Sequence, residues 1–392
     1  MTWASVAYAG LLLAAACYLC SFLPATITNV KRSATAQDCN EDVLDLIFAL
    51  CSPPTLAAAG RACKAWRQPA QRALFATISP KWHPENIEPR WPQLSRSLDE
   101  SAQLRSYVRY VRILFTRSVE LEHFQWLSLL PSQGLNSLVV YGNQDSRTFP
   151  ALRRLVLSCA AIKSVRSLVL SSPIIGDTAQ LEFYLSSCSL EHLGVIFLEA
   201  FSTTPMAPKC STRPIRRLSL QSSDLVDDIP NLIQACSKTL RRLDLNFVNL
   251  KPPNRERLTA ILAGVPQLEH LFLAWSEYRP IALLDNICRY LPNLRHLRAG
   301  ACLYTLDLFS NIPPTLKTLH LEYRSTRTST ELFPVEAAIR GLSSHPALER
   351  VTLQPHPGSP FVEFPQLATA CLSRGVHLLV LPTYFRESQL YE

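Results

Sequence analysis

The stretch LRRLDL, residues 240–245, decides the fold class of this 392-residue chain. Its three leucines are separated first by two variable residues and then by one. The same spacing of aliphatic residues returns along the chain: VRYVRI at 108, LNSLVV at 135, LRRLVL at 152, VRSLVL at 165, LEHLGV at 190, IRRLSL at 215, LEHLFL at 268, LRHLRA at 294, LKTLHL at 316, LERVTL at 348 and VHLLVL at 376. Starts at 165, 190, 215 and 240 are 25 residues apart. This period is typical of a repeat architecture, in which each copy stacks on the next.

Each copy predicts a short strand followed by a return leg. Alternate aliphatic residues of a strand point to one face, so they line the core of the repeat row. The return legs carry apolar residues at a period near 3.6 and are predicted as helices: NRERLTAILAGVP at 254–266 with Asn254 as N-cap, IALLDNICRYLP at 281–292, and VEAAIRGLSSHP at 335–346. The predicted fold class is α/β, a solenoid with a curved parallel sheet and helical return legs. The pattern resembles irregular leucine-rich repeats of the kind found behind F-box motifs.

The third and fifth positions of each copy face outward on the strand side. We expect a ladder of mostly basic side chains there: Arg154, Arg217, Arg242, Asp244, His270, His296, Arg298, His320 and Arg350, with Trp275 just past its strand. Arginine binds carboxylate and phosphate with two N–H groups at once, so the ladder suits an acidic or phosphorylated protein segment. The alternative is a solvated face that only keeps the sheet soluble.

Three short helical patterns precede the repeats. The first spans Asn40–Cys51, with Asn40 as its cap and one apolar face. The second begins at Ser52 and places Leu56, Ala59, Cys63 and Trp66 on one stripe, and Pro69 breaks it and starts a third helix. Three helices in about 40 residues bury little apolar area on their own, so we expect a partner to cover part of their surface. The alternative is that they only cap the open end of the solenoid.

Residues 41–78, EDVLDLIFALCSPPTLAAAGRACKAWRQPAQRALFATI, resemble an F-box in the first helix and in the Cys-x-x-Trp of the second. F-box proteins bind a Skp-type adaptor and, through it, a cullin–RING ubiquitin ligase. The resemblance implies an adaptor-binding signature of Val43, Leu44, Ile47, Phe48, Leu56, Cys63 and Trp66, and a repeat domain that binds the protein substrate. A non-catalytic interaction scaffold without a ligase role is the second interpretation.

The N-terminus is apolar. No charged residue precedes Lys31, and residues 6–23 (VAYAGLLLAAACYLCSFL) are just long enough to cross a bilayer. We expect either a membrane anchor with the rest of the chain facing the cytosol, or a start assigned too far upstream. The predicted organisation is a hydrophobic segment (1–32), the three-helix motif (38–78), a Pro-rich linker (79–106) that is irregular over 79–94, the repeat domain (107–385) and a tail (386–392).

Composition excludes several function classes. The net charge of +8 is carried by dispersed arginines, which does not favour a nucleic-acid partner. The twelve cysteines show no zinc-binding spacing, and no Asn is followed at +2 by Ser or Thr. Reduced thiols in the cytosol or nucleus fit best. Nucleotide-binding, zinc-protease and serine-hydrolase motifs are missing, so we expect no catalytic residue, metal or cofactor.

Overall fold

The computed structural model describes residues 41–79, 90–115, 121–142, 149–171, 178–187, 189–198, 215–222, 228–247, 252–275, 282–324, 333–356, 359 and 361–381. Two predicted segments, the apolar run 6–23 and the tail 386–392, lie outside these residues. Of the helices in the described ranges, none is long and apolar enough to span a bilayer.

The described residues contain twelve strands in one parallel sheet, and the strand order follows the chain. The strands are β1 (Thr77–Ile78), β2 (Tyr110–Phe115), β3 (Ser137–Gly142), β4 (Ser167–Ser171), β5 (His192–Leu198), β6 (Arg217–Ser222), β7 (Arg242–Phe247), β8 (His270–Trp275), β9 (His296–Ala299), β10 (Thr318–Tyr323), β11 (Arg350–Pro355) and β12 (His377–Val380). The helices are α2 (Glu41–Ala49), α3 (Pro53–Ala62), α4 (Lys64–Ala76), α5 (Arg90–Glu100), α6 (Ala102–Tyr107), η1 (Leu121–Leu129), α7 (Phe149–Ser158), η2 (Ala160–Ser164), α9 (Thr178–Ser187), α10 (Asp228–Cys236), α11 (Pro252–Ala263), α12 (Leu283–Ile287), η3 (Cys288–Tyr290), α13 (Leu308–Asn311), α14 (Val335–Ser344) and α15 (Pro365–Ser373).

The chain forms two compact units. Unit 1 comprises the residues up to Leu138 together with Arg154–Ser164, and unit 2 comprises Val139–Arg153 together with the residues from Val165 onward. This division does not follow the predicted boundary at 106/107. Strand β1 directly follows α4 and pairs with β2 through Thr77 and Tyr110, so the helices and the first strands share a unit.

The helices of unit 1 correct three predictions. The second helix ends at Ala62, because Cys63 is extended (φ −150°, ψ 159°), so Trp66 lies on the next helix. Pro69 does not break that helix but lies buried inside α4. Its ring removes one backbone hydrogen bond of the helix, and Pro69 and Ala70 are the buried residues of α4. The predicted irregular stretch 79–94 and the linker to 106 instead contain α5 and α6 from Arg90 onward.

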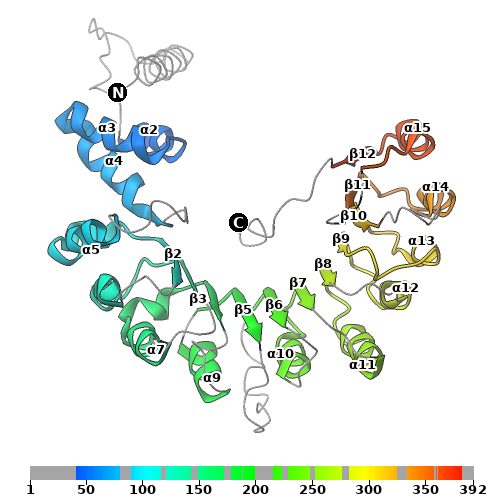
Figure 1. Cartoon of the computed structure of the whole chain (residues 1–392), viewed down its shortest axis with the longest axis horizontal. Helices are drawn as coiled ribbons and strands as arrows, with labels where there is room; N and C mark the ends of the chain where they lie inside the picture. Colours follow the sequence, from blue (N-terminus) through cyan, green and yellow to red (C-terminus); the bar gives the residue numbers. More distant parts are fainter. Residues whose placement is uncertain are drawn as a thin grey trace, which may run out of the picture. The chain divides into compact units, whose positions relative to one another are not determined.

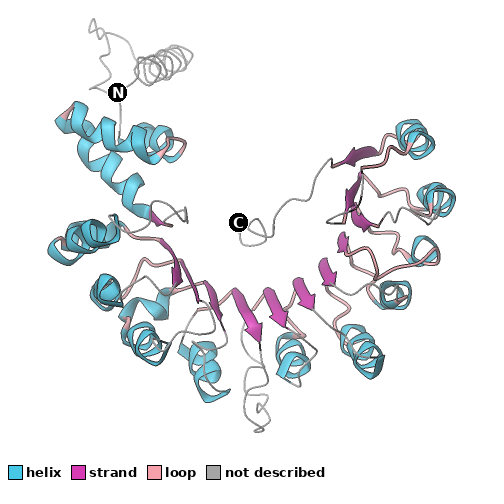
Figure 2. Ribbon diagram, in the orientation of Figure 1, coloured by secondary structure: helices cyan, strands magenta, loops and turns pink. Residues whose placement is uncertain are grey.

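Unit 2 is built as the repeat predicts. The central leucines of neighbouring strands, such as Leu218, Leu243 and Leu271, lie in register and are buried. Within this unit the strands lie along the inner side and the return helices α10 to α15 along the outer side (Figures 1 and 2). The parallel α/β solenoid architecture is therefore confirmed.

Two details of the repeat prediction were wrong. LRRLVL at 152 is not a strand but part of α7. It starts only 13 residues before the next copy, and its buried Leu152, Leu155 and Val156 have helical spacing. Asn254 does not cap its helix, because α11 already begins at Pro252. A proline is well suited to the first turn of a helix.

Candidate functional site

The first two outward positions of the strands of unit 2 form two rows across the sheet, because these strands pair in register. The first row is Ser167, His192, Arg217, Arg242, His270, His296, Thr318, Arg350 and His377. The second row is Val169, Gly194, Ser219, Asp244, Phe272, Arg298, His320, Thr352 and Leu379. Neighbours in a row are about 4.8 Å apart, the usual strand spacing, so a bound segment meets several at once.

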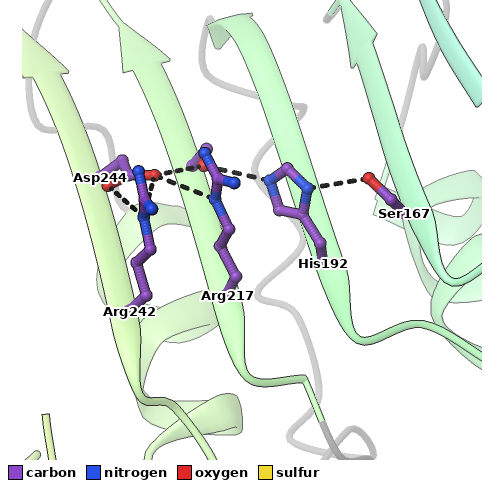
Figure 3. Close-up of polar contacts among 6 residues, drawn as sticks. Ser167, His192, Arg217, Arg242 and Asp244 are labelled. Atoms are coloured by element: carbon purple, nitrogen blue, oxygen red, sulfur yellow. Dashed lines mark hydrogen bonds and ion pairs between the residues drawn. The ribbon is translucent and has the colours of Figure 1, made fainter. Parts of the chain in front are cut away.

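Asp244 is the hub of the polar contacts on β4 to β7, which we call the Arg–Asp half of the face (Figure 3). The side chain of Asp244 is only 9% exposed. It accepts hydrogen bonds from Arg217 Nε at 3.2 Å, Arg242 Nε at 3.0 Å and Ser219 Oγ at 3.0 Å. A carboxylate with three charged or hydroxyl donors is well compensated for its burial.

His192 extends this network by one strand. Its ring lies between Ser167 Oγ, 2.9 Å from Nδ1, and Ser219 Oγ, 3.1 Å from Nε2. Since Ser219 gives its proton to Asp244, Nε2 must donate to Ser219 and Nδ1 must accept from Ser167. Burial, followed by the charge of Arg217, lowers the pKa of His192 to about 3. Such a ring is too weak a base to activate Ser167, so the chain of hydrogen bonds orients side chains rather than moving protons.

Strands β8 to β11 carry a different set of contacts, which we call the ring half. His270 and His296 stack with their ring centroids 4.2 Å apart. One row further, the guanidinium of Arg298 lies 4.7 Å from the centroid of Phe272 and 3.7 Å from Glu322 Oε1. His320 Nε2 is 2.9 Å from Gln354 Oε1. These contacts leave a surface made mainly of flat, stacked groups.

The histidines of the ring half do not add positive charge at neutral pH. Burial is the first cause that lowers the pKa of His270 and of His296. Burial, followed by the charge of Arg298, lowers the pKa of His320 to about 4. The expected basic ladder is therefore positive only at its arginines.

Most of the predicted ladder lies on the strand face, with two exceptions. Arg154 lies on α7 and is not part of the face, because its repeat copy is helical. Trp275 is the last residue of β8 rather than lying past it, and its side chain is outside the described part of the structure. The predicted ladder missed Ser167, His192 and Ser219. They occupy the same third and fifth positions, so the positional rule alone would have found them.

In unit 1, five of the seven predicted signature residues gather into one small core. Leu44, Phe48 and Leu56 are buried together with Ala70, and Ile47 and Trp66 pack against them. The Phe48 and Trp66 rings meet edge to face at 6.1 Å. Val43 and Cys63 are only half-buried. The signature therefore serves largely to hold α2, α3 and α4 together.

Helix α2 and the residue after it carry a second apolar stripe that the signature did not include. Val43, Leu46 and Leu50 recur at i, i+3 and i+7, which places them on one side of the helix. Leu46 is 71% and Leu50 is 91% exposed. The spacing of these three residues was the sequence signal for this surface.

The described residues include no group of His, Cys, Asp and Glu that could hold a metal ion. The seven described cysteines are thiols, and five of them are buried.

The comparisons with known proteins do not assign this chain to a family. No protein-family model and no curated protein matches the sequence. Among solved structures, the chain is similar to one in the crystal structure of the Rad7 and Elc1 complex in yeast. The match has 15% identity, covers 87% of this chain and 100% of that chain, and has a TM-score of 0.38. Because the TM-score is so low, this likeness does not bear on function.

Proposed function

We propose that this chain is the substrate-recognition subunit of a Skp–cullin–F-box ubiquitin ligase. Helices α2 to α4 act as an F-box that binds a Skp-type adaptor, and the strand face of the leucine-rich repeats binds the target protein. The observation that supports this proposal best is that α2 carries large apolar side chains on two sides, of which one is buried and the other exposed.

One side of α2 is covered by the neighbouring helices, whereas the other side is exposed. Leu44 and Phe48 close the core with α3 and α4. Leu46 and Leu50, on the second stripe, leave two large aliphatic side chains in water. An exposed apolar surface on a small helical motif marks an interaction site. The resemblance of residues 41–78 to an F-box supports a Skp-type adaptor as the partner that covers this surface.

The strand face suits the second task, target binding. Its outward rows offer arginines, hydroxyls and rings over nine neighbouring strands, β4 to β12. The ligase chemistry then belongs to other subunits, and this chain contributes proximity between target and conjugating enzyme. In this role the protein works in the cytosol or nucleus, or on a membrane facing the cytosol if residues 6–23 anchor it.

A non-catalytic interaction scaffold is the second candidate. Three of the seven signature residues, Leu44, Phe48 and Leu56, are buried in the core of the helices themselves. Helices with a complete core can act as a structural cap without any adaptor. The two candidates differ in one measurable property, which is binding to the adaptor.

Adaptor binding by the full chain is the test. The double variant Leu46→Asp, Leu50→Asp should reduce the affinity for a purified Skp-type adaptor more than about tenfold, because two charges replace the buried anchors of the interface. Leu372→Asp is the matched control, since it changes another highly exposed leucine on α15 of unit 2 and should bind like the wild type. Ile47→Ala and Trp66→Ala are poorer probes, because both side chains pack on the helical core. A wild-type chain that does not bind the adaptor leaves only the scaffold.

A further inference from the structure

Three side chains of the ring half carry hydrogen-bonding groups that no described residue fills. His270 makes no hydrogen bond through either ring nitrogen, and His296 uses only Nδ1, which lies 2.7 Å from Thr318 Oγ1. Arg298 donates no hydrogen bond within the described chain, since its ion pair with Glu322 is 3.7 Å long, beyond the range of an N–H···O bond. The Nε of Arg298 is buried without a partner. These groups are therefore able to bind a ligand.

The three side chains form one block with Phe272 on two neighbouring strands. His270 and Phe272 belong to β8, and they pair in register with His296 and Arg298 of β9. The two imidazoles stack at 4.2 Å, and the guanidinium lies 4.7 Å from the centroid of Phe272. Each donor on β9 is thus held by a ring on β8. A side chain that is already held in place loses less conformational entropy when it binds a ligand.

His296 and Arg298 are placed to share one acceptor group. They lie two residues apart on the same face of β9, which is about 7 Å along the strand. One carboxylate spans that distance with a hydrogen bond of about 2.8 Å at each end. The hydroxyl of Thr318 can donate to Nδ1 of His296, which places the ring N–H at Nε2. An imidazole N–H and a guanidinium fork are then available side by side.

The Arg–Asp half shows what an arginine of this face binds. There, Arg242 Nε lies 3.0 Å from a carboxylate of the chain itself, that of Asp244. At Arg298, no carboxylate of a described residue comes that close. A phosphate carries about −1.5 to −2 at neutral pH, and Glu322 beside Arg298 repels such a group more than it repels a singly charged carboxylate. The block therefore favours a carboxylate.

We propose that His296 and Arg298 bind the side-chain carboxylate of a glutamate or aspartate of the target protein, and that Phe272 is the positioning residue of the arginine. The inference rests on the proposed function, because it specifies what the strand face recognises. The acid of the target takes the place at Arg298 that Asp244 takes at Arg242. The ring half, rather than the Arg–Asp half, is then where the target's acidic residue binds.

The first test titrates the full chain, isotope-labelled at its histidine rings, with three short peptides that differ only at the central residue: glutamate, glutamine or phosphoserine. Both peptide ends are capped, so the side chain is the only carboxylate of the glutamate peptide. This peptide should shift the NMR signals of His270 and His296 and bind at least about tenfold more tightly than the glutamine peptide. The phosphoserine peptide should bind no more tightly than the glutamate peptide.

Two variants test the donors. Arg298→Lys keeps the charge but loses the fork, and should weaken binding of the glutamate peptide at least about fivefold. His296→Phe keeps a ring against His270 but removes both nitrogens, and should weaken it about three- to tenfold. The matched controls Arg350→Lys and His377→Phe change the same kinds of side chain on β11 and β12 and should bind like the wild type. Circular dichroism shows whether each variant is folded, and either donor variant suffices.

A second pair of variants tests positioning. Phe272→Leu should reduce the preference for glutamate over glutamine, because the guanidinium loses the ring that holds it. Phe272→Tyr keeps an aromatic ring and should retain the preference. A full preference in Phe272→Leu would remove the positioning role of this residue.

Three results would overturn the proposal: equal binding of the glutamate and glutamine peptides, binding of phosphoserine at least about tenfold tighter than glutamate, or an unchanged affinity in Arg298→Lys. Adaptor binding is measured on the same preparations. A missing glutamate preference with intact adaptor binding refutes only this site, whereas absent adaptor binding refutes the proposed function.

Discussion

The Arg–Asp half and the ring half of the strand face use the same positions of the repeat in opposite ways. In the first half, one buried carboxylate on β7 collects two arginines and a serine. In the second half, the equivalent positions hold stacked rings and an arginine over an aromatic ring. The repeat places the side chains in rows, whereas the type of side chain decides whether a row carries charge. Similar backbones therefore do not imply similar ligands along one solenoid.

Truncation of core side chains tests whether the two halves of the strand face differ only in their surface side chains. Unequal losses of stability would show that their cores differ as well. Leu243→Ala on β7 and Leu297→Ala on β9 remove equivalent buried side chains. Each should lower the free energy of unfolding by about 2–5 kcal/mol, and the two losses should be similar. Urea unfolding followed by circular dichroism measures both. Leu379→Ala, at a half-exposed position on β12, is the control and should cost less than either.

The rows of the strand face were predictable from the sequence. The spacing of aliphatic residues at 215, 240, 268 and 294 sets which side chains point outward, and the register of β6 to β9 follows it. Side chains at the third and fifth positions could thus be named without coordinates. The exposed stripe of Leu46 and Leu50 was also readable from its helical spacing.

Other features depend on tertiary packing and were not predictable. The break at Cys63 and the continuous helix through Pro69 reflect how α3 and α4 pack, which local propensity does not encode. The residues 152–157 fit either a strand or a helix, and packing selected the helix. The role of Asp244 as a hub, and the neutral state of His192 and His320, depend on burial and on side chains of adjacent strands.

Acidification tests both halves of the strand face, because each half holds one histidine whose pKa is strongly lowered. The pKa is lowered from 6.5 to about 3 for His192 and to about 4 for His320. Below pH 6.5 the unfolded chain takes up protons that the folded chain refuses, so stability is highest above pH 6.5 and falls towards the folded pKa values. Each histidine should contribute a loss of at most about 1.4 kcal/mol per pH unit in that range.

Single substitutions assign this loss to the two halves. His192→Gln and His320→Gln should each reduce the pH dependence of the free energy of unfolding between pH 6.5 and 5 by about the same amount. The double variant should reduce it by the sum, because the two sites share no contact. Urea unfolding at a series of pH values measures these slopes. An unchanged slope in either variant would show that the pKa of its ring is the same in the folded and in the unfolded protein.

The smallest expected effect concerns the contact between Arg298 and Phe272 in the ring half. A double-mutant cycle with Arg298→Met and Phe272→Leu should give a coupling energy of about 0.5–1 kcal/mol, the usual range for a partly exposed cation over a ring. The same cycle for Arg242→Met and Asp244→Asn should give more, about 1.5–3 kcal/mol, since that hydrogen bond joins two charged groups at 3.0 Å with one of them buried. Urea unfolding of each set of four proteins provides both values. A larger coupling energy in the ring half would reverse the order and would mean that the contact between Arg298 and Phe272 stabilises the protein more than the ion pair between Arg242 and Asp244.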